Sequence, residues 1–197
     1  MPYPQLLLSM LRLFVSTPLL RRRAIYQAFV FSAFCLFWTA SPLLLSSPAF
    51  HLSQIGIAIF ALVGVAGAVS APFAGRAADR GHLRAATTLA LLSCSASFVL
   101  GFLFPPGSLA ALGALVASAI LLDAGVSANL VLGQRAIFSL APELRSRLNA
   151  LYIATIFVGG ASGSALAAWS FAVGGWHLTA ACGLALPLCA FAYFITE

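Results

Sequence analysis

The sequence GRAADRGHLR, residues 75–84, decides the fold because it is a short arginine-bearing turn between two long apolar runs. All ten basic residues of the chain are arginines, and they form three clusters, of which this turn holds the second. The first cluster lies within residues 12–23 and the third within residues 135–147. The apolar stretches between and after the clusters are each about fifty residues long, which is enough for two membrane-spanning helices. The pattern predicts hairpins of transmembrane helices whose arginine-bearing turns share one side of a membrane.

Six segments reach the roughly 20 apolar residues that a membrane-spanning helix needs. They are residues 24–45, 55–74, 85–104, 109–132, 150–171 and 176–195. Spanning strands would be only about 10 residues long with alternating polarity, so helices are expected. The predicted fold class is an all-α membrane protein with six transmembrane helices. Because cytoplasmic loops carry the excess of arginine, both termini and both arginine-bearing turns are predicted to be cytoplasmic.

Composition also places the chain in a membrane. Hydrophobic residues make up 62% of it and charged residues only 7%, whereas soluble domains carry about a quarter charged residues. The net charge of +6 falls in the loops, where it sets topology and attracts anionic lipid headgroups, so no nucleic-acid partner is expected. The four cysteines lie in apolar runs and are interpreted as packing residues. The three histidines are far apart in the sequence, so neither a metal site nor a cofactor is predicted.

Residues 1–23 precede the first span and are predicted to form a cytoplasmic arm. Apolar side chains recur at helical spacing between residues 6 and 14, and Arg12 and residues 21–23 lie nearby. This pattern is typical of a short helix in the membrane interface. A disordered arm is the alternative, because proline and serine interrupt the pattern at both ends. Residues 24–197 are expected to form one transmembrane domain.

Asp123 is the only formal charge well inside a predicted span. It precedes Leu132, the predicted cytoplasmic end of its helix, by roughly 14 Å at 1.5 Å per residue. An ionisable group at that depth costs about 2.5–3.5 kcal/mol on insertion scales, so it is expected to face a cavity or a partner. Asp123 could bind a proton or a cationic substrate. It could equally be a protonated or hydrogen-bonded acid that fixes helix packing.

The first predicted span presents an aromatic face with a few polar groups. The residues of this face are Gln27, Phe31, Phe34, Trp38 and Ser41. A mostly apolar surface with few polar groups suits an amphipathic small molecule. It also suits plain packing between helices.

Small residues recur at four-residue spacing in two predicted spans. The second span has Gly67 and Gly75 on one ridge with Gly64 beside it, and the fifth has Gly159 and Gly163. In lipid, helices associate through close backbone approach, which small residues permit. These ridges predict tight helix pairs.

Residues 160–163, GASG, match the Gly-x-Ser-Gly nucleophile motif of rhomboid-type intramembrane serine proteases, which also have six spans. Such an enzyme needs a histidine at the depth of the serine. Ser162 lies roughly 13 Å below the outer end of its helix, whereas His177 begins the next span. This mismatch leaves the protease as a remote alternative.

Residues 75–82, GRAADRGH, resemble the loop signature of the major facilitator superfamily, which is a glycine, three residues, then Asp-Arg and a second glycine. The matching positions are Gly75, Asp79, Arg80 and Gly81. The family's fuller form has a residue between the arginine and the second glycine, whereas Gly81 follows Arg80 directly. In this chain the loop joins the second and third predicted spans.

A longer resemblance covers residues 122–135, 142–152 and 159–163, with the sequences LDAGVSANLVLGQR, PELRSRLNALY and GGASG. These stretches are similar to the C-terminal half of bacterial efflux permeases of that superfamily, the group that contains sugar-efflux and multidrug transporters. The arm resembles the link between the two halves of such permeases. The resemblance therefore covers essentially all 197 residues.

The resemblance implies a fold of twelve spans in two six-helix halves, with a substrate cavity between them at mid-membrane. This chain is expected to supply half of such a bundle, beginning at the central linker. The implied cytoplasmic gate comprises the signature loop, with Gly75, Asp79, Arg80 and Gly81, together with Arg145 and Arg147. The candidate cavity residues are Gln27, Phe34, Trp38, Ser41, Asn129 and Tyr152.

The expected function is that of a half-length major-facilitator-type transporter in a bacterial inner membrane, whose full-length relatives export small molecules by proton antiport. Its expected partners are the lipid bilayer, a small-molecule substrate, and either a separate N-terminal half or a second copy of itself. The alternative is a non-transporting membrane subunit or a truncated inactive fragment. No residue discriminates among a drug, a sugar and an amino acid as substrate.

Overall fold

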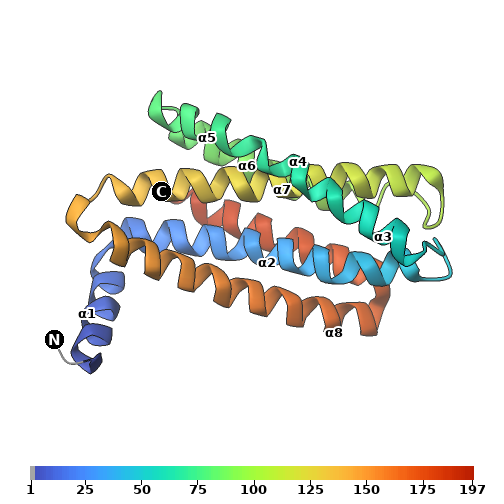
Figure 1. Cartoon of the computed structure of the whole chain (residues 1–197), viewed down its shortest axis with the longest axis horizontal. Coiled ribbons are helices and arrows are strands. Elements are labelled where there is room, and N and C mark those ends of the chain that lie inside the picture. Colours follow the sequence, from blue (N-terminus) through green and yellow to red (C-terminus); the bar gives the residue numbers. More distant parts are fainter. Residues whose placement is uncertain (1–2) are drawn as a thin grey trace.

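The computed structural model describes residues 3–197, and these residues form helices and turns without a strand. The longest elements are α2 (Pro18–Ser46), α6 (Leu83–Leu100), α7 (Leu109–Phe138) and α8 (Arg145–Phe194). Four stretches are long and apolar enough to cross a membrane, namely the first three of these helices and Pro142–Phe194, which contains α8. Figure 1 shows α2, α7 and α8 running along the long axis of one bundle. An all-α fold with four candidate membrane spans is therefore confirmed for the described residues.

α8 contains a break where a turn between the fifth and sixth spans is expected. Gly174 (φ −136°, ψ 15°) and Gly175 (φ 58°, ψ −154°) both leave helical geometry. Glycine adopts a positive φ at little cost, so Gly175 permits the chain to reverse. The two arms of α8, orange and red in Figure 1, run in opposite directions. Beside the break the hydroxyls of Ser170 and Thr179 lie 3.1 Å apart and join the arms.

The segment expected as the second span, residues 55–74, is divided in the structure. It comprises α3 (Gln54–Ala61), the 3-10 turn η1 (Leu62–Gly64), α4 (Val65–Ala68) and α5 (Ser70–Asp79). Each of these pieces is shorter than a membrane span. Gly64 and Gly67 lie at the division, where glycine lowers helix propensity and a 3-10 turn changes the course of the helix. Residues 55–74 are therefore not one continuous helix in the structure.

Two helices extend beyond the boundaries that hydropathy predicts. α2 begins at Pro18 rather than at Ala24, because proline is favourable in the first turn of a helix. α7 continues to Phe138 rather than ending at Leu132. Both extensions carry arginines, which hydropathy assigns to loops although the backbone is still helical.

α1 (Tyr3–Ser16) stands away from the bundle near the start of α2 (Figure 1). Leu8, Leu11 and Val15 are exposed, while Leu13 and Phe14 pack against a small core at the start of α2. A helix with an exposed apolar face beside arginines is typical of a membrane interface. Met1 and Pro2, at the start of the predicted arm, lie outside the described residues.

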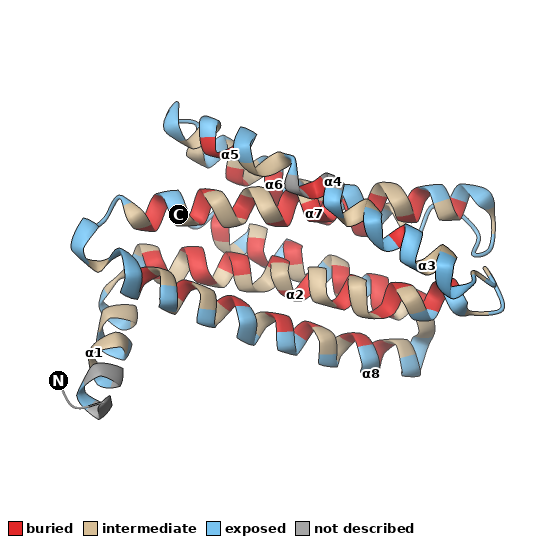
Figure 2. Cartoon of the chain, in the orientation of Figure 1, coloured by how far each residue is buried: buried red, intermediate tan, exposed pale blue. Residues whose placement is uncertain are grey.

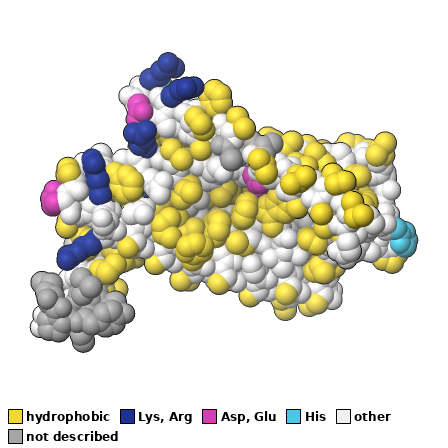
Figure 3. Space-filling view, in the orientation of Figure 1, with side chains coloured by type: hydrophobic (Ala, Val, Ile, Leu, Met, Phe, Trp, Pro, Cys, Tyr) yellow, Lys and Arg dark blue, Asp and Glu magenta, His cyan; other side chains and the backbone are white. Residues whose placement is uncertain are grey.

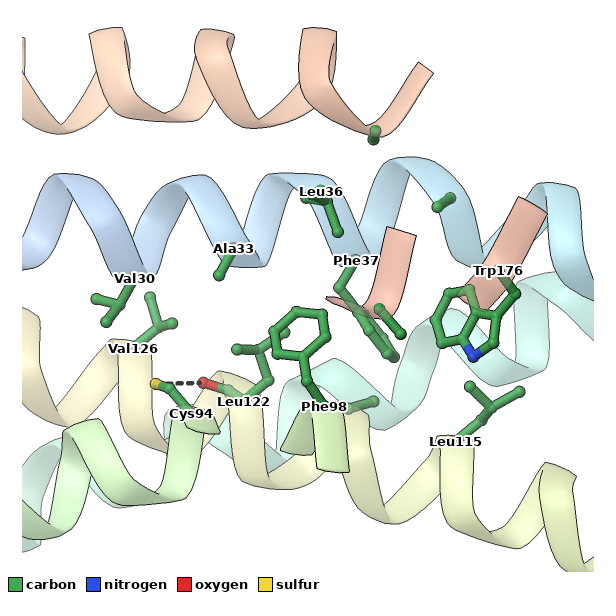
Figure 4. Close-up of a cluster of buried hydrophobic side chains, with 14 of the residues drawn as sticks. Val30, Ala33, Leu36, Phe37, Cys94, Phe98, Leu115, Leu122, Val126 and Trp176 are labelled. Carbon is green, nitrogen blue, oxygen red and sulfur yellow. Dashed lines mark hydrogen bonds between the residues drawn. The ribbon is translucent and has the colours of Figure 1, made fainter. Parts of the chain in front are cut away.

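The main core lies between α2, α6, α7 and the second arm of α8, and the buried residues follow their inner faces (Figure 2). Figure 4 shows side chains from these helices meeting around Phe37. The ring of Phe37 packs edge-on against Phe98 and Trp176, with centroid distances of 6.2 and 6.0 Å. Cys94 contributes a thiol that donates weakly to the Leu122 carbonyl at 3.9 Å. Aromatic and small side chains thus tie four segments into one core.

The three arginine clusters meet at one end of the bundle, at the left in Figure 3. Arg23 of the first cluster donates to Thr87 Oγ1, close to the second, at 3.0 Å. Arg135 of the third cluster pairs with Asp79 in the second at 3.1 Å. The molecule therefore has one basic end, called the basic end below.

Candidate functional site

Asp123 lies in the middle of α7, and three segments enclose its side chain. Its exposed fraction is 6%. Trp38 of α2 donates its indole Nε1–H to Asp123 Oδ1 at 3.0 Å. On another side, a Cβ built on Gly64 would lie 2.6 Å from Asp123 Oδ2, and a Cβ on Gly67 would overlap Asp123 Cβ. The glycines of the divided segment therefore allow its backbone to cover the carboxyl group.

This arrangement leaves the two carboxyl oxygens of Asp123 in different surroundings. Oδ1 accepts from Trp38, whose indole nitrogen can only donate. Oδ2 faces Gly64, next to the edge of the Trp38 ring. Of the two oxygens, Oδ1 is therefore the one held by a hydrogen-bond donor, and Oδ2 is the one that packs against glycine. Gly64 and Gly67 were predicted only as a packing ridge, and their spacing gave no sign of the carboxyl group beneath them.

A second polar contact joins α2 and α7 closer to the basic end. Asn129 Nδ2 donates to Gln27 Oε1 at 2.7 Å, and Gln27 Nε2 donates to the Val126 carbonyl at 3.2 Å. Both amide side chains are buried. A buried amide is costly unless it is hydrogen-bonded, so this pair fixes the two helices against each other. The structure brings these two predicted cavity residues together in helix packing.

Two further predicted cavity residues, Ser41 and Tyr152, are also fully buried. The Ser41 hydroxyl donates to the Phe37 carbonyl in its own helix. Tyr152 packs on Gly133, and its hydroxyl donates to the Leu130 carbonyl at 3.4 Å. Their contacts are those of packing residues.

The aromatic face of α2 is the partly open part of the predicted cavity. Phe31 and Phe34 stack with centroids 5.4 Å apart, and Phe34 lies 6.3 Å from Trp38. All three are half-buried. Phe157 of α8 packs edge-on against Phe31 at 6.1 Å. This aromatic face therefore ends at Trp38, the residue that holds Asp123.

The predicted gate residues fall into two neighbouring places at the basic end. A cleft of about 640 Å³ is lined by Asp79, Gln134, Arg135 and Arg145, among others. Within it, Arg145 Nε donates to the Phe138 carbonyl at 3.0 Å. Arg80 lines a second pocket with residues of α5 and α6, and Arg147 is exposed.

The two glycines of the loop signature have distinct structural roles. Gly81 has φ 82° and ends α5, since its N–H donates to the Ala78 carbonyl at 3.0 Å and that of His82 to Ala77 at 2.9 Å. This pair of bonds is the Schellman helix end, which requires a left-handed residue at that position and accounts for a glycine directly after Arg80. Gly75 is buried against α7, where a Cβ would lie 3.7 Å from Arg135 Nη2.

Sequence reasoning missed the role of Arg23, which has an exposed fraction of 4%. Its guanidinium donates to Thr87 and pairs with Glu197 Oε1 at 3.3 Å. The Tyr26 hydroxyl donates to Glu197 Oε2 at 3.0 Å. Residues 23 and 197 are joined only by the packing of α8 against α2, so no local pattern could have indicated the contact.

The structure also places the residues of the protease motif. The Ser162 hydroxyl donates to the Val158 carbonyl of its own helix at 2.9 Å. Roughly three helical turns separate Ser162 from the break in α8, and His177 lies just beyond that break, with its ring 6.4 Å from the ring of Phe102. Ser162 and His177 are thus engaged with different parts of the bundle.

Comparisons with known proteins agree with this architecture. The chain is 36% identical over 186 residues to an uncharacterized transporter, YgaY, of Escherichia coli O157:H7, and 36% identical over 186 residues to the putative uncharacterized transporter YgaY of strain K12. It is 31% identical over 165 residues to a probable transporter of Streptomyces coelicolor. These matches cover 94%, 94% and 81% of this chain, and 46%, 46% and 36% of the relatives. The chain thus spans about half the length, or less, of the curated relatives it matches.

No solved structure gives a significant match. The family model described as Major Facilitator Superfamily matches residues 19–197. With this match, the transporter relatives and the apolar helical bundle, the chain belongs to the major facilitator superfamily.

Proposed function

We propose that this chain forms one six-helix half of an exporter that exchanges an amphipathic small molecule for protons. The observation that carries the proposal is the position of Asp123, buried at mid-helix between Trp38 and Gly64. An acid inside a membrane helix is costly, and such residues commonly serve ion and proton pathways. The aromatic face of α2 ends at the same tryptophan and offers an apolar surface to a substrate.

In this proposal the chain crosses the membrane six times. α8 contributes two passes, one on each side of Gly175, and the divided segment from α3 to α5 contributes one. Interrupted helices are tolerated at membrane depth where they are buried in protein or line a cavity. The basic end and both chain termini face the bacterial cytoplasm. The arm of residues 1–23 lies at the interface of the inner membrane.

The exchange would use one oxygen of one residue. Asp123 Oδ1 stays with Trp38, while Oδ2 binds either a proton or a cationic group of the substrate. Because both occupants compete for Oδ2, uptake of one favours release of the other. Gln27, Asn129, Ser41 and Tyr152 would keep the helices behind this site in place.

A transport cycle also needs a surface opposite the aromatic face of α2. We assign that surface to a separate N-terminal half or to a second copy of this chain, which would complete the cavity. The cleft lined by Asp79, Arg135 and Arg145 would meet the partner at the basic end and act as the cytoplasmic gate. The exposed Arg147 would extend that contact.

The test measures proton-driven efflux in vesicles that contain the chain alone or together with a matching six-helix half. The chain alone should give no flux, and co-assembly should restore it. Asp123→Asn should abolish proton coupling in the assembled form, whereas Glu143→Gln, the same change at an exposed acid, should not. Flux by a verified monomer would refute the need for a second half. Unchanged coupling in Asp123→Asn would refute the proton role, and an assembled pair without any flux would favour a non-transporting subunit.

A further inference from the structure

A groove lies between α5 and α6, and Asp123 is not among the residues that line it. Its apolar part has a volume of about 370 Å³ and is lined by small and apolar side chains from α5, α6 and α7. The serines in its wall are Ser70 and Ser93, whose hydroxyls donate to the carbonyls of Ala124 and Leu121 at 2.8 and 2.7 Å. The polar atoms of the wall are therefore satisfied, and the groove offers a hydrocarbon surface.

A second pocket, of about 490 Å³, continues this groove at the basic end. Both parts share the residues Phe73, Ala77, Ala86 and Leu89. The second pocket adds Arg76, Arg80 and His82 to the lining. The two pockets thus form one groove, with an apolar part and a basic part.

The positive charge of the basic part is not neutralised by the protein. Within residues 3–197, no ion pair involves Arg76 or Arg80, and the adjacent acid, Asp79, pairs with Arg135. The guanidinium of Arg76 lies over the Phe73 ring at 5.8 Å, directly above the wall that both parts share. Figure 3 shows basic side chains gathered around the tip of α5.

The length and exposure of the apolar part match a position in one leaflet. From Ser70 to Ala77 the α5 wall extends roughly 10 Å at 1.5 Å per residue, within the roughly 15 Å of one hydrocarbon leaflet. Phe73 and Leu89, on opposite walls, have exposed fractions of 62% and 68%. Alanines on both walls keep the space between them open. A hydrocarbon chain that entered from the bilayer would therefore bring its headgroup to the arginines.

We propose that this groove binds one anionic phospholipid, with an acyl chain along the alanines of α5 and α6 and the phosphate at Arg76 and Arg80. Arginine matches phosphate geometry with paired N–H donors. Anionic lipids of the cytoplasmic leaflet are attracted to basic residues at that depth. The inference uses the exposed side of α5 and does not depend on proton exchange at Asp123.

The test is native mass spectrometry of the purified full chain after titration with phosphatidylglycerol or phosphatidylcholine. Each arginine should raise the affinity for the anionic lipid about fivefold. For the two arginines together, we expect one phosphatidylglycerol to be bound roughly thirtyfold more tightly than one phosphatidylcholine. Arg76→Gln/Arg80→Gln should remove this preference, and Arg12→Gln/Arg147→Gln, which removes the same charge elsewhere, should retain it. Circular dichroism would establish that the variants keep their helical content.

A groove-filling variant separates a lipid site from a phosphate site. Ala77→Phe should reduce retention of both lipids at least tenfold, with Ala86→Leu on the facing wall as a smaller replacement should Ala77→Phe misfold. Excess inorganic phosphate should not displace the lipid. Equal loss of preference in both arginine pairs would overturn the proposal, as would unchanged retention in both filled variants. A lipid-free dimer that Ala77→Phe or Ala86→Leu dissociates would show instead that a second copy occupies the groove.

Discussion

Gly67→Ala tests how closely α4 approaches Asp123. A Cβ on Gly67 would overlap Asp123 Cβ and lie 2.7 Å from the Asp123 carbonyl carbon and 2.8 Å from Ala124 N. These neighbours are mostly main chain, which cannot rotate away, so α4 must move. Overpacking of this kind costs about 1–3 kcal/mol, and the alanine's helix propensity returns about 0.5–1 kcal/mol of it. We expect the free energy of unfolding to fall by roughly 1–2 kcal/mol.

Gly113→Ala in α7 is the matched control. A Cβ there would have no atom within 4 Å, and Gly113 is exposed. Since there is no steric conflict, only the higher helix propensity of alanine matters, and the free energy of unfolding of Gly113→Ala should rise by about 0.5–1 kcal/mol. Both variants would be unfolded in mixed micelles by increasing the fraction of denaturing detergent, with helical circular dichroism as the readout. If Gly67→Ala and Gly113→Ala shift the unfolding midpoint in the same direction by similar amounts, α4 does not pack closely against α7. The close contact of Gly67 with Asp123 would then be refuted.

Three further outcomes are expected. Gly81→Ala should lower the free energy of unfolding by about 1–2 kcal/mol, because Gly81 has a φ of 82°. Gly81→Asn should lower it less, since asparagine tolerates the left-handed conformation better. Equal losses for the two variants in the same detergent titration would contradict the Schellman helix end. Asp79→Asn should change stability by less than about 1 kcal/mol, because its pair with Arg135 is more than half exposed, and a larger loss would show a stronger role in the cleft. Trp38→Phe and Asp123→Ala, each of which removes one partner of the hydrogen bond, should be coupled in a double-mutant cycle by about 0.6–2 kcal/mol, whereas additive effects would rule out that bond.

Local sequence pattern was enough to predict the class of fold and the tight helix contacts. Hydropathy located the apolar helices, although it started α2 too late and ended α7 too early, because helical backbone continues past the hydrocarbon region. The small residues of the fifth predicted span indicated close packing. A Cβ on Gly159 or Gly163 would overlap the main-chain oxygen of Ala28 or Ser32, so α8 lies directly on α2.

The candidate site was predictable only in part. Asp123 stood out because charge is rare inside a span, and Trp38 because it lies on an aromatic face. Their contact depends on how α2 and α7 cross, which neither helix encodes alone. The division of the second predicted span depends likewise on Gly64 and Gly67 meeting Asp123 in space. Gln27 and Asn129 were predicted to line a cavity because they are polar residues within spans. In the structure their amide side chains are instead hydrogen-bonded to each other.

The contact between Arg23 and Glu197 has a consequence for how the chain enters the membrane. The two residues are 174 positions apart. At 5–20 residues per second, translation places roughly 10–35 s between them. During that interval Arg23 lacks the carboxylate that it pairs with in the finished bundle, so the start of α2 must remain near water or lipid headgroups. When the last turn of α8 arrives, Glu197 reaches Arg23 and Thr196 accepts from Arg22 at 3.0 Å. Burial of Arg23 is therefore a late event in assembly, set by the order of synthesis.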